Sequence, residues 1–257
     1  MDARRGTEVN RIEAVVKALD VLEGLWRAEG AGVTELTEET GLAKSTVHAH
    51  LSTLRSKGYV VKHGDEYRLS LRFLSFGEYV KQAEPMYEAS ETPVADLAER
   101  TGERVLCSAQ QNGLGMIVRA DDGNRSVTSD IDVGTPIYLH CSAGGKAMLA
   151  HFDDQRVERV VNEWGLPAFT DETITNWDTL SAELEEIREA GIAYNRGEYL
   201  PGVSAVAAPV IDNDGNVYGA ITVSGPSHRL ENEWEIDELH NQLLSAANTI
   251  EVNLLFS

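Results

Sequence analysis

Residues 33–60 of the chain read VTELTEETGLAKSTVHAHLSTLRSKGYV. The first part, residues 35–40, suits a short helix that stops at Gly41, because glycine readily takes the left-handed backbone of a tight turn. The second part carries apolar side chains four and three residues apart, on one face of a helix, at Val47, Leu51 and Leu54. The stretch therefore predicts a helix, a glycine turn and a second helix that begins near Lys44.

The residues on either side of this stretch predict two further elements. Residues 10–28 form a first helix that ends near Gly30, because apolar side chains recur in it at helical spacing, at Ile12, Val15, Leu19, Leu22 and Trp26. Thr34 is the expected N-cap of the helix that follows. After the third helix, YVVKHGDEYRLS over 59–70 has two β-prone runs around His-Gly-Asp, the pattern of a hairpin. A hairpin in this place is the wing of a winged helix-turn-helix.

The exposed face of the third helix carries short polar side chains and a few basic ones, which suit the reading of base edges in the major groove. Basic residues of the hairpin suit phosphate contacts. Each of these side chains alone is more simply a solvated surface group, but the order of helix, helix, turn, helix and hairpin favours DNA binding. The candidate DNA-binding residues are Thr34, Lys44, Ser45, Thr46, His48, Ala49, His50, Ser52, Arg55, Lys62, His63 and Arg68.

The formal charge of −20 opposes an approach to phosphates, but its distribution removes the difficulty. Up to residue 82 the chain has twelve basic and twelve acidic side chains, so all of the net charge lies beyond that point. Between Lys44 and Arg72 basic residues outnumber acidic ones. Six lysines stand against 42 acidic residues in the whole chain, a composition that resembles proteins of salt-accumulating haloarchaea. At molar salt the Debye length is about 3 Å, so the acidic part is screened from DNA.

Composition also indicates the compartment. No apolar run approaches the roughly 18 to 20 residues that cross a bilayer, and the start of the chain has no apolar core of the signal-peptide kind. We therefore expect a cytoplasmic protein with no membrane partner. Cys107 and Cys141 lack the spacing of a zinc site or a disulfide framework, and we expect no metal and no cofactor.

Beyond about residue 84, helix-like runs such as 93–100 and 180–190 alternate with strand-like runs. The strand-like runs include 104–109, 116–120, 205–211 and 217–223. The last two are joined by DNDGN, a turn between β-branched runs that predicts an antiparallel hairpin. The expected fold class is α+β, with an N-terminal winged helix-turn-helix followed by an α/β domain with an antiparallel sheet.

These motifs together resemble those of the IclR family. Residues 33–60 look like the family's winged helix-turn-helix, and VGTPIYLHCSAGGKAMLA (133–150) and GIAYNRGEYLPGVSAVAAPVIDNDGNVYGAITVSGP (191–226) look like its GAF-like effector domain. Many family members have Arg and Leu where this chain has Ala49 and His50, so His48, His50 or Lys44 would replace that base contact. The resemblance implies a DNA-binding domain over 1–69, a linker helix over 70–84 and an effector-binding domain over 85–257.

The resemblance implies a sequence-specific transcriptional regulator, not an enzyme, whose operator occupancy changes when a small polar metabolite, such as a carboxylate or a sugar acid, binds as effector. It also implies a homodimer, or a dimer of dimers, on double-stranded DNA with a near-palindromic operator. Ala205 stands where relatives often have cysteine. The effector-binding positions that the resemblance carries over are Cys141, Ser142, Ala143, Gly144, Met148, Asn195, Ala205, Thr222 and Ser224.

Two other classes of function stay open. Cys141, with His140 or His151 as base, would serve a small-molecule enzyme, although no sequence feature orients such a base. The winged helix would alternatively bind a protein, and that association would be insensitive to salt. Gly144-Gly145-Lys146 is not a P-loop, because Ala147 follows the lysine. The acidic run ELEEIREA (183–190) is expected to be solvated surface.

Overall fold

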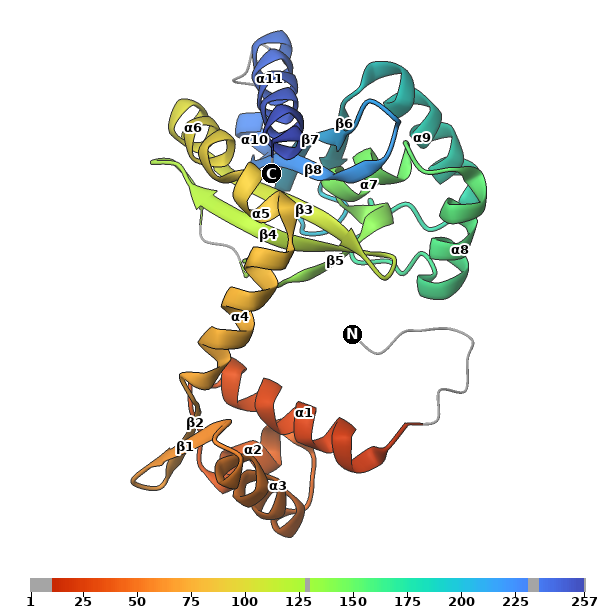
Figure 1. Ribbon diagram of the computed structural model, residues 1–257. Coiled ribbons are helices and arrows are strands. Elements are labelled where there is room, and N and C mark those ends of the chain that lie inside the picture. Colours follow the sequence, from red (N-terminus) through yellow and green to blue (C-terminus); the bar gives the residue numbers. More distant parts are fainter. Residues whose placement is uncertain (1–10, 128–129, 231–235, 257) are drawn as a thin grey trace. The chain divides into compact units, whose positions relative to one another are not determined.

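The computed structural model describes residues 11–127, 130–230 and 236–256, and Figure 1 shows its helices and strands. Contacts within the chain gather in two compact units that divide between Ala83 and Glu84, and each unit has its own hydrophobic core. Within these described ranges, no helix is long and apolar enough to cross a bilayer.

The first unit is a winged helix-turn-helix, as the sequence predicts. Its elements are α1 (Glu13–Arg27), α2 (Val33–Thr40), α3 (Lys44–Ser56), β1 (Val60–His63), β2 (Glu66–Leu69) and α4 (Arg72–Ala83). Apolar side chains from the three helices and the hairpin form its core, including Val21, Leu25, Leu36, Val47, Leu51 and Tyr67. The core therefore holds α3 in place from one side and leaves its other side to solvent.

The start of α2 differs from the prediction. The N-cap is Gly32, whose N–H donates to the Glu35 carboxylate at 2.8 Å, and Thr34 lies within the first turn. The prediction of Thr34 as N-cap is wrong, because a carboxylate three residues into the helix already satisfies the free amide. The predicted end is confirmed: Gly41 has φ 66° and closes the helix in the left-handed conformation.

The predicted wing is confirmed as an antiparallel hairpin. Val60 lies opposite Leu69 and His63 opposite Glu66, so Gly64 and Asp65 form a two-residue turn. The left-handed φ of 59° at Gly64 suits this turn, because glycine has no Cβ to oppose it.

The second unit contains a six-stranded antiparallel sheet in the order β5-β4-β3-β8-β7-β6. The strands are β3 (Arg104–Gln111), β4 (Leu114–Asp122), β5 (Pro136–Tyr138), β6 (Ala193–Arg196), β7 (Val203–Ile211) and β8 (Val217–Pro226). The hairpin predicted from DNDGN joins β7 and β8. At that turn Asp212 accepts hydrogen bonds from the backbone N–H groups of Asp214 and Asn216, at 2.9 and 2.8 Å.

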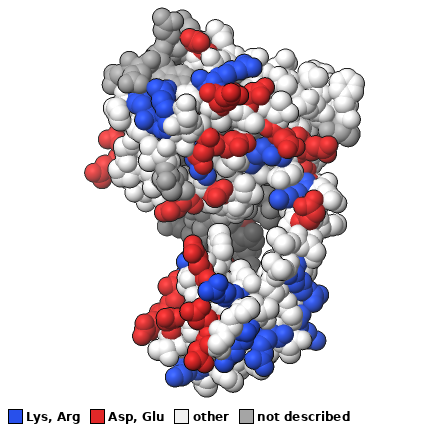
Figure 2. Space-filling view, turned by 90° about the vertical axis from the view of Figure 1, so that its left-hand side faces the viewer, with Lys and Arg blue, Asp and Glu red and all other residues white. Residues whose placement is uncertain are grey.

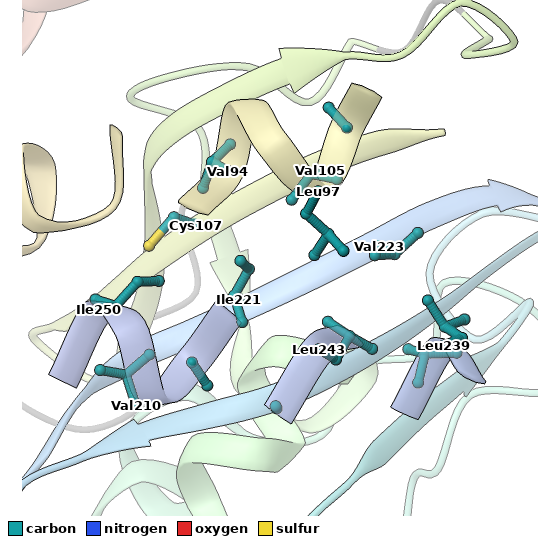
Figure 3. Close-up of a cluster of buried hydrophobic side chains, with 14 of the residues drawn as sticks. Val94, Leu97, Val105, Cys107, Val210, Ile221, Val223, Leu239, Leu243 and Ile250 are labelled. Carbon is teal, nitrogen blue, oxygen red and sulfur yellow. The ribbon is translucent and has the colours of Figure 1, made fainter. Parts of the chain in front are cut away.

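One face of this sheet packs against α5 (Pro85–Ala89), α6 (Glu91–Thr101) and α11 (Ile236–Leu255). Successive side chains of a strand point to opposite faces. Val105 and Cys107 of β3 therefore face these helices together with Ile221 of β8. Figure 3 shows these side chains meeting Leu97 of α6 and Leu243 of α11.

The other face carries the short 3-10 turn η1 (Leu139–Cys141) and the helices α7 (Ala143–Leu149), α8 (Asp154–Trp164) and α9 (Trp177–Ala190), while α10 (Ser227–Leu230) follows β8. Leu149, Leu180 and Leu184 of these helices pack on Ala207 and Ala220 of the sheet. The small alanine side chains let α7 lie close to β7 and β8. That close approach sets the geometry of a pocket between α7 and the sheet.

Candidate DNA interface and ligand pocket

The DNA-reading candidates on α3 lie on its solvent side. Val47 and Leu51 are fully buried, whereas Lys44, His48 and Arg55 are exposed. Ser45, Ala49 and Ser52 are also exposed, and Thr46 and His50 lie half-buried at the border. An exposed helix face of short polar and basic side chains, with its back against a core, has the form that enters a major groove.

The wing does not bring its basic residues together. Lys62 is paired across the hairpin with Tyr67, and Arg68 with Val61, so the two basic side chains project from opposite faces. The Lys62 ammonium lies 5.4 Å from the centre of the Tyr67 ring, and the Arg68 guanidinium is 3.1 Å from the Glu66 carboxylate. Lys62, which has no carboxylate partner among the described residues, is the better placed of the two to meet a phosphate. His63 and Thr34 are exposed on β1 and α2.

Charge is unevenly distributed over the first unit. Figure 2 shows Lys and Arg side chains gathered on one part of its displayed face and Asp and Glu side chains on another. The acidic residues of α2, Glu35, Glu38 and Glu39, precede the turn at Gly41, whereas α3 itself carries Lys44 and Arg55 and no acidic residue. The basic side of the unit is therefore the side that suits a polyanion.

The second unit contains a pocket between α7 and the sheet. It is partly open to solvent, and the empty space between its walls and across its mouth is about 590 Å³. Aliphatic side chains form much of its wall, including Leu106, Ile117, Ile131, Ile137, Met148, Leu200 and Val203. No lysine, arginine, histidine, aspartate or glutamate is among its lining residues in the part of the chain that the structure describes. A small molecule with an apolar portion fits such a wall.

Polar groups converge at one side of the pocket. Ser108 of β3 and Thr222 of β8 are both nearly buried, and their hydroxyl groups have no hydrogen-bond partner among the described residues. A methyl group placed on Gly144 would lie 2.8 Å from Thr222 Oγ1 and 3.2 Å from Ser108 Oγ, so both hydroxyls point at the start of α7. Unpaired hydroxyls beside an open cavity are suited to donating hydrogen bonds to a ligand.

The start of α7 is fixed by Ser142. Its hydroxyl donates to the Tyr138 carbonyl at 3.1 Å and accepts from the Gly145 N–H at 3.2 Å. The helix begins at Ala143, because this hydroxyl caps it. The adjacent Gly145 permits a backbone approach that a side chain would block, since a Cβ there would lie 2.3 Å from the Leu139 carbonyl oxygen.

Nine effector positions were inferred from the family resemblance, and eight of them line this pocket. These eight lie on α7, β6, β7 and β8 and at the Ser142 cap. The exception is Cys141, whose side chain is fully buried against Leu114, Tyr138 and Trp164. Its thiol lies 3.6 Å from the Tyr138 carbonyl, and burial raises its pKa well above the ordinary range. Cys141 contributes to the site only through its carbonyl, which accepts a hydrogen bond from Asn195 at 2.7 Å.

Sequence reasoning missed several of the pocket's residues. Ser108, Tyr199 and Leu200 line it, and none of them carries a local motif. Ser108 is recognisable only once the register of β3 is known, because it shares a face with Leu106. The candidate bases also lie elsewhere: His140 contacts the Pro167 carbonyl at 3.1 Å, and burial lowers its pKa. Among the described residues no group of three or more His, Cys, Asp or Glu side chains is arranged to hold a metal ion.

Comparisons with known proteins bear on both units. The family model described as IclR helix-turn-helix domain matches residues 14–64, and the one described as Bacterial transcriptional regulator IclR C-terminal matches residues 78–252. A relative from Halobacterium salinarum, named "Probable HTH-type transcriptional regulator ArcR", is 30% identical over 257 residues, covering 98% of each chain.

Solved structures show the same fold. The crystal structure of the Thermotoga maritima IclR matches with a TM-score of 0.79 and 24% identity, covering 95% of this chain and 99% of that one. An IclR homologue from Microbacterium hydrocarbonoxydans, solved in complex with 4-hydroxybenzoate, matches with a TM-score of 0.79 and 19% identity, covering 95% of this chain and 100% of the other.

Proposed function

The chain belongs to the IclR family of DNA-binding transcriptional regulators, and from that membership we propose that α3 and the β1–β2 wing read an operator while a small molecule in the α7 pocket controls operator occupancy. The main support for the proposal is that eight effector positions inferred from the family resemblance line the same open pocket. In this proposal residues 1–69 bind DNA, 70–84 link and 85–257 bind the effector, with 1–10 outside the described residues.

The exposed face of α3 supports the assignment of base-reading residues. Lys44, His48 and Arg55 project from it together with the small Ser45, Ala49 and Ser52 side chains. Lys62 and His63 of the wing are the proposed phosphate contacts, with Arg68 on the opposite hairpin face. The half-buried Thr46 and His50 and the exposed Thr34 complete the proposed interface.

Exposed apolar side chains support a homodimer, or a dimer of dimers. On α1, Trp26 is 64% exposed, and α4 with its preceding residue carries Leu71, Leu74 and Tyr79 at 83%, 67% and 72%. Soluble proteins seldom leave so much apolar surface on adjacent turns of a helix to water. A pair of such units would place two α3 helices about 34 Å apart, or a multiple of that, on a near-palindromic operator.

Effector control requires a ligand that binds one arrangement of the paired units better than another, because only that difference changes operator occupancy. The pocket wall supports an effector that combines an apolar portion with groups able to bond Ser108 and Thr222. The ligand of the Microbacterium relative, 4-hydroxybenzoate, has both features and is the first compound to try.

The same geometry disfavours the enzyme alternative. The Cys141 thiol is buried, burial raises its pKa, and its hydrogen bond goes to the Tyr138 carbonyl and not to a base. A nucleophilic cysteine needs an accessible thiolate. We propose a regulator without catalytic residues, acting on DNA in the cytoplasm.

The test is operator release. DNA that the protein selects from a random library is labelled, and its fluorescence anisotropy with the protein is followed as a panel of small acids, sugar acids and 4-hydroxybenzoate is added. We expect at least one compound to change the apparent Kd by about five- to 150-fold, the usual range of allosteric coupling. Thr222→Val should remove that response and leave DNA binding intact. A response retained in Thr222→Val would contradict the assignment of the pocket.

A further inference from the structure

Lys146 is the only lysine beyond residue 82, and it is completely buried. A lysine is almost never fully buried unless its charge is paired. It lies in α7, directly after Gly144 and Gly145 of the pocket wall, but its ammonium group does not line the pocket. The helix therefore carries a buried cation immediately behind the pocket wall.

Two carboxylates neutralise this cation. Lys146 Nζ contacts Glu183 of α9, and it donates to Glu198 Oε1 at 2.7 Å. Glu198 is 7% exposed, its second oxygen has no hydrogen-bond partner among the described residues, and burial raises its pKa against the lowering effect of Lys146. A buried ion pair seldom stabilises a fold more than apolar residues of similar size would. Stability alone is thus a poor explanation for this arrangement.

Glu198 belongs to the loop between β6 and β7, which runs from Gly197 to Gly202, both with positive φ. The next two residues of this loop, Tyr199 and Leu200, line the pocket. The ion pair therefore ties the loop to α7, and α7 forms the facing part of the wall.

Asn195 extends the same network. Its side-chain oxygen accepts from the Glu198 N–H at 3.0 Å, and its side-chain nitrogen donates to the Cys141 carbonyl at 2.7 Å. Asn195 is itself a lining residue of the pocket. Two further bonds hold the loop from its other side, from Thr170 to the Gly197 carbonyl at 2.8 Å and from Thr173 to the Glu198 carbonyl at 2.6 Å.

We propose that Lys146 and Glu198 are positioning residues of the effector pocket, whose ion pair holds the 197–202 loop against α7 so that Tyr199 and Leu200 close the wall. The proposal rests on the proposed function only in taking this pocket as the effector site. The role of Glu183 differs, because it pairs with the same ammonium from α9 and lies outside the loop.

The matched variants are Glu198→Met and Glu183→Met, which remove one carboxylate each from the same lysine at nearly constant length. Hydrogen exchange of the full chain, without DNA or effector, reports the opening of the loop. Loss of a hydrogen bond to a charged group shifts an opening equilibrium by about ten- to 100-fold. We expect exchange at 197–203 to accelerate by about that factor in Glu198→Met and by less than about twofold in Glu183→Met.

Access to the pocket provides a second readout. Ser108→Cys places a thiol inside the wall, and its rate of reaction with methyl methanethiosulfonate measures how often the loop opens. The rate should rise about tenfold when Glu198→Met is added and stay unchanged when Glu183→Met is added. Wild-type protein gives the background, because Cys107 and Cys141 are both buried.

Thermal unfolding separates positioning from a merely structural role. If Glu198→Met keeps the Tm of the wild type and still loosens the loop and opens the pocket, the proposal stands. Should Glu198→Met fail to fold, Glu198→Gln takes its place, with a smaller rise expected because the amide oxygen still accepts from Lys146. Equal rates of amide exchange at 197–203 and of thiol labelling in the Glu198 and Glu183 variants would overturn the proposal. The hydrogen bonds from Thr170 and Thr173 would then be enough to hold the loop. None of these readouts involves operator or effector, so their failure is distinct from a failure of the proposed function.

Discussion

Gly144 and Gly145 are adjacent in α7, yet the structure predicts losses of stability of very different size when each is replaced by alanine. A Cβ on Gly144 would meet the ends of two side chains, Thr222 Oγ1 at 2.8 Å and Ser108 Oγ at 3.2 Å. A Cβ on Gly145 would meet backbone, the Leu139 carbonyl oxygen at 2.3 Å and Cα at 2.5 Å. Hydroxyl groups can turn away, whereas the backbone of η1 cannot move without carrying its neighbours with it.

The magnitudes follow from this difference. Overpacking destabilises a fold by about 1–3 kcal/mol, whereas the higher helix propensity of alanine stabilises it by about 1 kcal/mol. Gly144→Ala should therefore lower the free energy of unfolding by about 0–2 kcal/mol. In a unit of this size about 2–4 °C of Tm is lost per kcal/mol, giving a drop of at most about 8 °C. Gly145→Ala should reach the exceptional range above about 4 kcal/mol, a drop of more than about 8 °C or a failure to fold.

Thermal unfolding of the full chain, followed by circular dichroism, measures both variants. Gly77→Ala serves as the control for propensity alone, because a Cβ at that position of α4 has no atom within 4 Å. The folded Gly144→Ala protein should also lose its effector response, since the new methyl group occupies the polar side of the pocket. A Gly145→Ala protein that melts within a few degrees of wild type, or a Gly144→Ala protein that is the less stable of the two, would contradict the contacts described for these glycines.

Three further predictions concern the core, the thiols and pH. Leu51→Ala removes a fully buried side chain from the first unit's core and should cost about 2–5 kcal/mol in urea unfolding, whereas a loss below 1 kcal/mol would contradict the packing described. Burial raises the pKa of Cys107 to about 12 and that of Cys141 further, so neither native thiol should react with iodoacetamide at about pH 8 until urea is added; rapid labelling of the folded protein would be the opposite result. Burial lowers the pKa of His140, so the unfolded chain binds this proton at a higher pH than the folded chain does. The free energy of unfolding should therefore fall as pH drops below about 6.5, and less steeply in His140→Gln. Identical slopes for the two proteins would show that His140 does not cause the pH dependence.

The first unit could be predicted well from sequence because its signals are local. The position of Gly41 fixes the turn between α2 and α3, and the spacing of Val47 and Leu51 fixes the buried face of α3. The wing follows from a Gly-Asp turn between two β-prone runs. The cap at Thr34 was predicted wrongly. Gly32 is the N-cap instead, because its N–H donates to the Glu35 carboxylate.

The second unit could be predicted only in part, because its site depends on contacts between distant residues. The DNDGN turn predicted β7 and β8, and family resemblance supplied eight positions of the pocket. Cys141 points away from the pocket because it ends a 3-10 turn, a feature that its neighbours in sequence do not signal. Glu183 was expected to be solvated surface, but it contacts a lysine that is 37 residues distant in the chain.

Whether the solvent face of α3 reads DNA can be measured by the binding of α3 variants to DNA. Fluorescence anisotropy compares wild type, His48→Ala and Arg55→Ala on DNA from upstream of the protein's own gene and on random DNA, over KCl concentrations up to near-molar. Arg27→Ala is the matched control, an exposed arginine of α1 that pairs with Glu23 and Glu39. We expect selective binding that weakens as salt rises, with an affinity that falls by about five- to 150-fold in the two α3 variants but not in the control. Binding that is equal on both DNAs, or equally affected by Arg27→Ala, would contradict it.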